Sequence, residues 1–166
     1  NFLAEILKRK LKVVENRYSK SQLEYERYAI IALSSIYGIE LLEDNVIECR
    51  DRLFGEFSRY YLKKFKNKIK SEVLKVAEFI LSRNILWGDA LSLKSPDETE
   101  PLVFSEWSAV NGNLLKRRDY TLSNLLETST EGLSLFSDLG EDIFIPSPIA
   151  DYPLTHFLKI GRNEQN

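Results

Sequence analysis

A series of basic residues between positions 59 and 75 is the part of this sequence best suited to binding a charged ligand. Its members are Arg59, Lys63, Lys64, Lys66, Lys68, Lys70 and Lys75. Rows of lysine and arginine bind phosphate backbones, and aromatic rings such as those of Tyr60, Tyr61 and Phe65 stack on unpaired bases. The pattern therefore indicates a contact with nucleic acid or with an acidic protein surface.

A solvated helix face explains the same lysines without any ligand. Ion pairs such as Lys68 with Glu72 would stabilise that helix, and the aromatic residues, which follow helical spacing, would belong to its core side. From the sequence we favour this solvated or partner-contacting face and keep direct contact with DNA or RNA as the alternative. A second basic cluster has the same two interpretations; it consists of Lys8, Arg9, Lys10 and Lys12.

Residues that could support catalysis or bind a metal do not form a recognisable motif. The single histidine, His156, and the single cysteine, Cys49, are far apart in the sequence and too few for a structural zinc site. A group of carboxylates could bind Mg²⁺, but the start of a predicted helix also explains it through the helix dipole. These carboxylates are Glu40, Glu43, Asp44, Glu48 and Asp51. We therefore predict a protein that is not an enzyme and uses neither cofactor nor metal.

The composition is that of a globular domain. Of 166 residues, 43% are hydrophobic and 29% charged, and no apolar run is long enough to cross a bilayer. With one cysteine there is no internal disulfide, so we expect an intracellular protein, cytoplasmic or nuclear, without a membrane contact. Residues 1–94 hold 18 Lys and Arg against 13 Asp and Glu, whereas residues 95–166 hold 5 against 12. This split predicts two contact surfaces of opposite charge, or attraction between the two parts.

The elements that position the basic series are predicted to be helices. Apolar residues recur in steps of three and four through the stretch from Val46 to Trp87, at Leu53, Phe57, Tyr61, Phe65, Ile69, Val73, Val76 and Ile80. This spacing predicts one long helix, with a break near Asn67 or Ser71 as the alternative. Two further helices, Phe2–Arg17 and Gln22–Tyr37, are expected to cover its apolar side. We thus predict a mainly α fold, with an antiparallel helical bundle around a long central helix in residues 1–90.

Residues 91–166 are predicted to form a less regular region that packs on the bundle or on a partner. A short helix is expected over Val103–Tyr120, interrupted at Asn111-Gly112, and a second over 121–126. From Asp142 onward three prolines exclude a continuous helix, so extended chain is expected there. Extended apolar segments dock on partners, which makes four side chains candidates for such a contact: Phe144, Ile145, Tyr152 and Phe157.

Two stretches resemble the GINS subunits of the replicative helicase. In SQLEYERYAIIALSS (21–35), Glu24, Glu26 and Arg27 match a Glu-x-Glu-Arg run that precedes apolar residues in the long-helix segment of that family. The stretch EFSRYYLKKFKNKIKSEVL (56–74) is similar to the helix that follows. The resemblance implies a helical scaffold with a small appended β-domain, in a complex that is not itself an enzyme. The chain departs from the family at Gly38 and the acidic turn after it, and from Asp142 onward, where the β-domain pattern is not apparent.

A second resemblance concerns the helical N-terminal part of the primase large subunit. RYAIIALSSIYGIELL (27–42) and EWSAVNGNLL (106–115) carry it. That family is also non-catalytic and contacts a catalytic partner. Both resemblances imply the same kind of function: a non-enzymatic subunit of a DNA replication complex that acts through contacts with other protein subunits.

Overall fold

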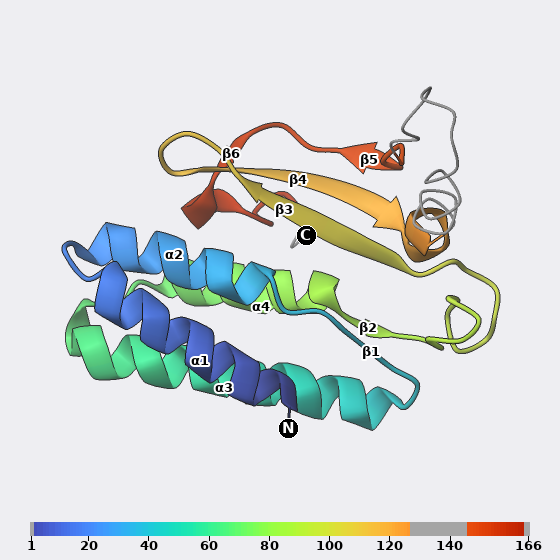
Figure 1. Cartoon of the computed structure of the whole chain (residues 1–166), viewed down its shortest axis with the longest axis horizontal. Helices are drawn as coiled ribbons and strands as arrows, with labels where there is room; N and C mark the ends of the chain where they lie inside the picture. The colour runs from blue at the N-terminus through green and yellow to red at the C-terminus, as the bar shows by residue number, and fades with distance from the viewer. Residues whose placement is uncertain (1, 127–145, 165–166) are drawn as a thin grey trace, which may run out of the picture.

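The computed structural model, described here for residues 2–126 and 146–164, is mainly α and has a layer of helices beneath a small sheet (Figure 1). The main elements in chain order are α1 (Phe2–Arg17), α2 (Gln22–Ser34), β1 (Gly38–Glu40), α3 (Glu43–Phe65), η1 (Lys66–Lys68), α4 (Ser71–Asn84), β2 (Ile85–Trp87), β3 (Val103–Ala109), β4 (Leu114–Thr121), β5 (Ala150–Asp151), β6 (Thr155–His156) and η2 (Phe157–Lys159). Helices α2 and α4 contact β3 of the sheet that β3, β4, β5 and β6 form, and α1 and α3 lie on the side away from that sheet (Figure 1). No helix in the described part of the chain is long and apolar enough to span a membrane.

The four helices share one core because each buries an apolar stripe at helical spacing. In α1 the stripe is Leu7, Leu11 and Val14, and in α3 it includes Leu53, Phe57 and Tyr61, all at most 5% exposed. Ser21 is the N-cap of α2: its hydroxyl accepts a hydrogen bond from the Glu24 amide at 3.1 Å. Successive helices run in opposite directions (Figure 1).

The prediction of one continuous helix through residues 46–87 is wrong, and the alternative, a break near Asn67, is what occurs. Helix α3 ends at Phe65, where Lys66 adopts φ 51°, ψ −117°, and α4 starts at Ser71 and runs back along α3. The apolar spacing continues across the break because α3 and α4 line the same core. The expected ion pair between Lys68 and Glu72 is not formed, since an i,i+4 pair requires a continuous helix between its members.

Strands β1 and β2 extend α2 and α4 beyond the bundle as a parallel pair. Gly38 pairs with Ile85 and Glu40 with Trp87. The buried Asn84 fixes this junction, because its amide donates to the Ser34 carbonyl at 2.9 Å and the Ile36 carbonyl at 3.1 Å and its oxygen accepts from Trp107 Nε1 at 2.8 Å. The pair thus joins helix ends that are about 50 residues apart in sequence.

The predicted short helix over Val103–Tyr120 is a β-hairpin instead. Strands β3 and β4 are antiparallel, with Val103 opposite Thr121 and Ala109 opposite Leu115, and Gly112 takes φ 68° in the turn. Alternate β4 residues face the bundle and are buried, whereas those between them are partly exposed. This alternation and the Asn-Gly pair are signals of a hairpin that the helical interpretation overlooked. The helix expected over 121–126 does occur across 122–126.

The described part of the C-terminal segment pairs with β4 of its own chain. Strands β5 and β6 add to β4, and η2 follows against α4. Phe157 is fully buried in the chain's own core, which corrects its assignment as a partner-docking residue. The ring of Tyr152 covers the Arg117 guanidinium at 4.0 Å, so it too contacts its own fold. The other two docking candidates, Phe144 and Ile145, lie outside the described residues.

Candidate partner and nucleic-acid interfaces

One end of the bundle collects exposed cations from two loops that are distant in sequence. Arg17 ends α1 and Lys20 follows it, while Lys63 lies in the last turn of α3 and Lys66 and Lys68 lie in the turn between α3 and α4. We call these five residues the basic end. The Gln22 side chain joins the two loops by donating to the Lys68 carbonyl at 2.7 Å. Within residues 2–126 and 146–164, none of the five has an acidic side chain at ion-pair distance. Their charge is therefore available to a ligand.

A buried acid, Glu26, holds the turn that carries this charge. Its side chain is fully buried, accepts from Tyr61 Oη at 2.6 Å and pairs with Lys70 Nζ at 2.9 Å. Tyr61 Oη in turn accepts from the Lys70 amide at 3.0 Å. Burial, helped by the hydrogen bond to Glu26, raises the pKa of Tyr61 to about 12, so its hydroxyl stays protonated and continues to donate. Lys70, a predicted contact residue, is thus paired with the buried Glu26, although its own side chain is 37% exposed.

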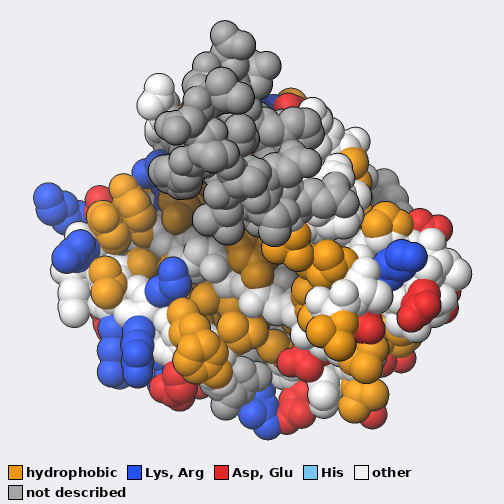
Figure 2. Space-filling view, turned by 45° about the vertical axis from the view of Figure 1, so that its right-hand side comes forward, with side chains coloured by type: hydrophobic (Ala, Val, Ile, Leu, Met, Phe, Trp, Pro, Cys, Tyr) orange, Lys and Arg blue, Asp and Glu red, His pale blue; other side chains and the backbone are white. Residues whose placement is uncertain are grey.

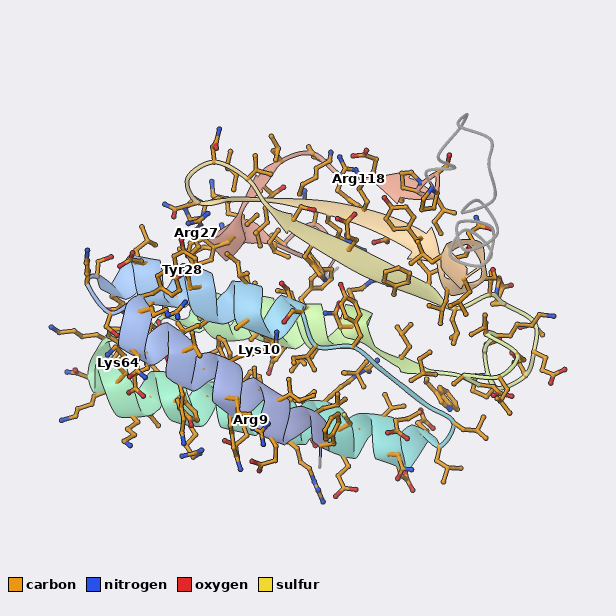
Figure 3. All side chains as sticks on the ribbon, in the orientation of Figure 1. Arg9, Lys10, Arg27, Tyr28, Lys64 and Arg118 are labelled. Carbon is orange, nitrogen blue, oxygen red and sulfur yellow. The ribbon has the colours of Figure 1, made fainter. Side chains whose placement is uncertain are left out.

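The remaining predicted basic residues divide into paired and unpaired side chains. Lys8 contacts Glu5 at 2.8 Å and Glu56 at 3.6 Å, and Arg59 contacts Glu56 at 2.6 Å. The Lys64 ammonium lies over the rings of Tyr25 and Phe65 at 5.6 and 5.8 Å. Arg9 and Lys10 lie along α1, whereas Lys64 lies near the end of α3 (Figure 3). The two predicted clusters therefore meet only at Glu56, which contacts both Lys8 and Arg59.

The opposite end of the bundle exposes large hydrophobic side chains. Leu41 and Leu42 follow β1, Ile47 is in the first turns of α3, and Trp87 and Leu91 end β2 and follow it. We call these five residues the apolar end; their exposure ranges from 44% at Trp87 to 95% at Leu91. Figure 2, turned so that this side comes forward, shows hydrophobic side chains gathered on the middle and right of the face and Lys and Arg on the left.

Hydrogen bonds fix the backbone around the apolar end, so its exposed side chains project from an ordered part of the chain. Trp87 Nε1 donates to the Leu41 carbonyl at 3.1 Å, and the Gly88 amide donates to the Glu40 carbonyl at 3.0 Å. A Cβ on Gly88 would lie 2.8 Å from the Lys94 carbonyl oxygen, so only glycine fits here. Arg50 Nε donates to the Ile85 carbonyl at 3.1 Å and closes the end of α4.

Exposed carboxylates lie on one side of the apolar end, along α3. Glu43, Asp44, Glu48 and Asp51 lie on the first three turns of α3 beside Ile47. They are among the residues considered for Mg²⁺, but within the described residues no three His, Cys, Asp or Glu side chains are arranged to hold a metal ion. Cys49 is buried on α3 near this end, whereas His156 lies in β6 and accepts a hydrogen bond from the Leu158 amide. The structure does not bring this cysteine and histidine together.

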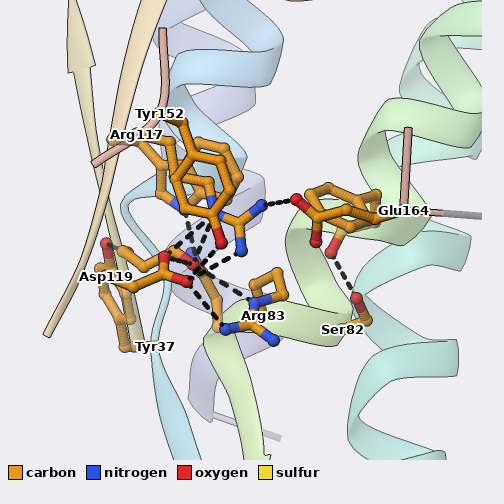
Figure 4. Close-up of polar contacts among 11 residues, drawn as sticks. Tyr37, Ser82, Arg83, Arg117, Asp119, Tyr152 and Glu164 are labelled. Atoms are coloured by element: carbon orange, nitrogen blue, oxygen red, sulfur yellow. Dashed lines mark hydrogen bonds and ion pairs between the residues drawn. The ribbon is translucent and has the colours of Figure 1, made fainter. Parts of the chain in front are cut away.

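A buried network of charges joins the sheet to α4 (Figure 4). Arg117, 5% exposed, donates from Nε and Nη2 to the two oxygens of Asp119, both at 3.0 Å. Arg83 Nη2 lies 3.2 Å from the same carboxylate, and Ser105 Oγ donates to it at 2.7 Å. Burial alone would raise the pKa of Asp119, but the hydrogen bonds from Arg117 and Ser105 and the charges of Arg117 and Arg83 hold it below its ordinary 3.8.

No family model, curated protein or solved structure matches the chain significantly. The resemblances to GINS subunits and to the primase large subunit therefore stay predictions.

The sequence interpretation missed most of the residues that form these sites. Helical spacing places Glu26 four and seven residues before the buried Ile30 and Leu33, which is the signal that this acid is buried and needs a partner. Arg117 and Asp119 alternate along β4 with Lys116 and Arg118. This alternation indicates that Arg117 and Asp119 face the core only if the segment is first recognised as a strand. The apolar end has no signal of its own, because its hydrophobic residues come from two separate segments.

Proposed function

We propose that this protein is a non-enzymatic subunit of a multiprotein assembly, and that the assembly acts in DNA replication inside the cell. The observation that carries the proposal is the apolar end: five large hydrophobic side chains exposed together on a hydrogen-bonded junction of β1, β2 and α3. Exposed apolar clusters rimmed by polar groups are typical of protein–protein contacts.

The rim of the apolar end indicates the kind of partner. Glu43, Asp44 and Asp51 lie beside it, together with Glu48, which pairs with Arg52. Because opposite charges around an apolar centre favour association, the expected partner surface has apolar side chains at its centre and Lys or Arg around them. The resemblance of residues 21–35 and 56–74 to GINS subunits is the reason for proposing replication as the setting. The second stretch spans the break between α3 and α4, so it is not the single helix that the resemblance implies.

The experiment that tests this function is quantitative affinity purification from the source organism. The wild-type chain is compared with Leu42→Asp/Trp87→Asp, which places two charges in the apolar end. We expect replication proteins with a basic contact surface to co-purify with the wild type and to be at least tenfold depleted with the variant.

Leu62→Asp is the matched control, because Leu62 is an exposed leucine on α3 near the basic end and is 53% exposed against 62% for Leu42. It should retain the partners. Equal recovery with all three chains, or a recovered set without replication proteins, would contradict the proposal.

A second function, direct binding of single-stranded nucleic acid, is favoured by the basic end. Its five cations have no ion-pair partner in the described chain, so a polyanion could bind without breaking existing ion pairs. The aromatic rings expected to stack on bases are mostly enclosed: Tyr61 is buried, and Phe65 packs against the core. Binding would therefore depend on phosphate contacts and would show little sequence preference.

The test of this second function is the salt dependence of binding to a labelled single-stranded oligonucleotide, measured by fluorescence anisotropy. Lys63→Gln/Lys66→Gln/Lys68→Gln should lower the slope of log K against log salt by roughly 2, since each phosphate contact contributes about 0.7. A variant with the same charge change along α1, Arg9→Gln/Lys10→Gln/Lys12→Gln, should have a smaller effect. Equal slopes for wild type and both variants would exclude the basic end as the contact.

A further inference from the structure

A small cavity lies between β4 and the segment that follows η2. Its volume is about 210 Å³. Side chains that reach it include Arg117, Tyr152, Thr155, Lys159, Arg162 and Glu164. Three of these six are cations and one is an acid, so the cavity carries an excess of positive charge. No residue of the apolar end or of the basic end lines it.

Arg117 is held so that one nitrogen of its guanidinium, Nη1, is not bonded to Asp119. Asp119 accepts from Nε and Nη2, while the planar group stacks under Tyr152 at 4.0 Å and lies 5.2 Å from Phe79 and 5.6 Å from Trp107. These contacts fix the plane of the group. The remaining nitrogen, Nη1, donates at 2.5 Å to Glu164 Oε1 (Figure 4).

The Glu164 carboxylate thus occupies a position where an external anion could bind the same nitrogen. Its segment turns at Gly161, which has φ 76° and approaches Phe79 so closely that a Cβ would lie 2.5 Å from the ring. Beyond this fixed turn, the contacts of Glu164 are the Arg117 ion pair and its amide hydrogen bond to the Gly161 carbonyl at 3.2 Å. Lys159 and Arg162 are exposed beside it and have no ion-pair partner within the described residues.

We infer that this cavity binds an oxyanion with two negative charges, either inorganic phosphate or the phosphoryl group of a small monoester, and that Glu164 is the chain's own substitute for it. Arg117, Lys159 and Arg162 carry three positive charges, and the Asp119 carboxylate neutralises one of them. A dianion therefore balances the remaining two better than the single charge of Glu164 does. A buried arginine with a fixed plane is also suited to phosphate oxygens, which accept several hydrogen bonds at once. This inference does not depend on the proposed function.

The test is isothermal titration calorimetry of the whole chain with inorganic phosphate at constant ionic strength. Phenyl phosphate distinguishes a monoester from the free ion, acetate tests a single charge, and chloride is the reference. Glu164→Gln removes the competing carboxylate and should tighten phosphate binding by roughly tenfold. Lys159→Ala and Arg162→Ala should each weaken it about threefold to tenfold, as expected for a charged hydrogen-bonding partner.

Lys12→Ala is the control for general charge, because Lys12 is an exposed lysine on α1 that does not line this cavity; it should bind phosphate as the wild type does. A second readout uses Trp87→Phe, which leaves Trp107 as the only tryptophan, so that phosphate near Arg117 changes its fluorescence. Binding no stronger than that of chloride, or binding unchanged in Glu164→Gln, Lys159→Ala and Arg162→Ala, would overturn the inference.

Discussion

The two ends of the helical bundle expose opposite kinds of side chain and support them in different ways. Helix α3 has 23 residues and separates the ends by about 34 Å at 1.5 Å per residue. At the basic end, free lysines lie over a buried charged clamp of Glu26, Lys70 and Tyr61. At the apolar end, exposed hydrophobic residues lie over neutral hydrogen bonds centred on Asn84 and Trp87.

This difference is physically consistent with two separate contacts. An ion pair under the lysines fixes the turn without neutralising the exposed charges, since Lys70, and not Lys63 or Lys66, pairs with Glu26. Under the apolar end, the neutral side chains of Asn84 and Trp87 and the Arg50 guanidinium donate to backbone carbonyls and fix its shape. A polyanion and an apolar protein surface could therefore bind at the same time, each at its own end.

The largest expected effect is at the clamp. Glu26→Ala removes a fully buried carboxylate, so Tyr61 Oη loses its hydrogen-bond acceptor and Lys70 loses its ion-pair partner. We expect a loss of about 3 kcal/mol in the free energy of unfolding. Urea denaturation measures this loss. Glu24→Ala, two residues away on the same helix and partly exposed, should cost no more than about 0.5 kcal/mol. Similar losses in both variants would show that Glu26 is not a special support of this end.

The corresponding change at the other end is Asn84→Ala. It leaves the Ser34 and Ile36 carbonyls and Trp107 Nε1 without partners in a buried site, and the expected loss is about 2 kcal/mol. Hydrogen exchange should then show faster exchange in β1 and β2 and unchanged exchange at the α3–α4 turn. Faster exchange at both ends to the same degree would mean that the two ends are not supported independently.

Away from both ends, the network at Asp119 predicts a specific pH dependence. Its folded-state pKa lies below the ordinary 3.8, so its contribution to stability is complete above that pH and is lost as the pH falls from about 4 toward the folded-state value. Asp119→Asn should cost about 2 kcal/mol at pH 7 and show a shallower loss of stability below pH 4 than the wild type. Parallel pH profiles for the two proteins would contradict this assignment.

The smallest effect is expected at the turn of the basic end. Lys66 has φ 51° and ψ −117°, a conformation that favours glycine, so Lys66→Gly should stabilise the chain by about 1 kcal/mol while removing one cation. Thermal unfolding and oligonucleotide binding measure the two effects separately. Lys68 is an exposed neighbour whose φ is not positive. Lys68→Gly should therefore weaken oligonucleotide binding as Lys66→Gly does but should not raise the stability of the chain.

How far the sequence predicts this molecule depends on whether a signal is local. The stripe Leu53, Phe57 and Tyr61 was predicted and is buried, because helical spacing is a property of a single segment. The break at Lys66 has no proline or glycine to mark it and depends on Gln22 and Glu26, which are distant in sequence.

The candidate sites show the same limit. Lysine clusters are visible in the sequence, but the ion pair of Lys8 with Glu56 depends on a neighbour from another helix. Lys63 has no ion-pair partner within residues 2–126 and 146–164. The apolar end requires the β1–β2 pairing, which joins residues 40 and 87. Tertiary packing determines such contacts, so they cannot be predicted from composition or residue spacing.

Site-specific photocrosslinking in the source cells tests most directly whether the apolar end binds a protein partner. A photoreactive residue at Leu91, 95% exposed, reports on the apolar end; one at Lys66 reports on the basic end, and one at Glu78, exposed on α4, is the reference. We predict that a photoreactive residue at position 91 crosslinks to a replication protein, identified by mass spectrometry, and that Leu42→Asp/Trp87→Asp abolishes the crosslink. Crosslinking at position 91 no stronger than at position 78, or unaffected by those substitutions, would contradict it.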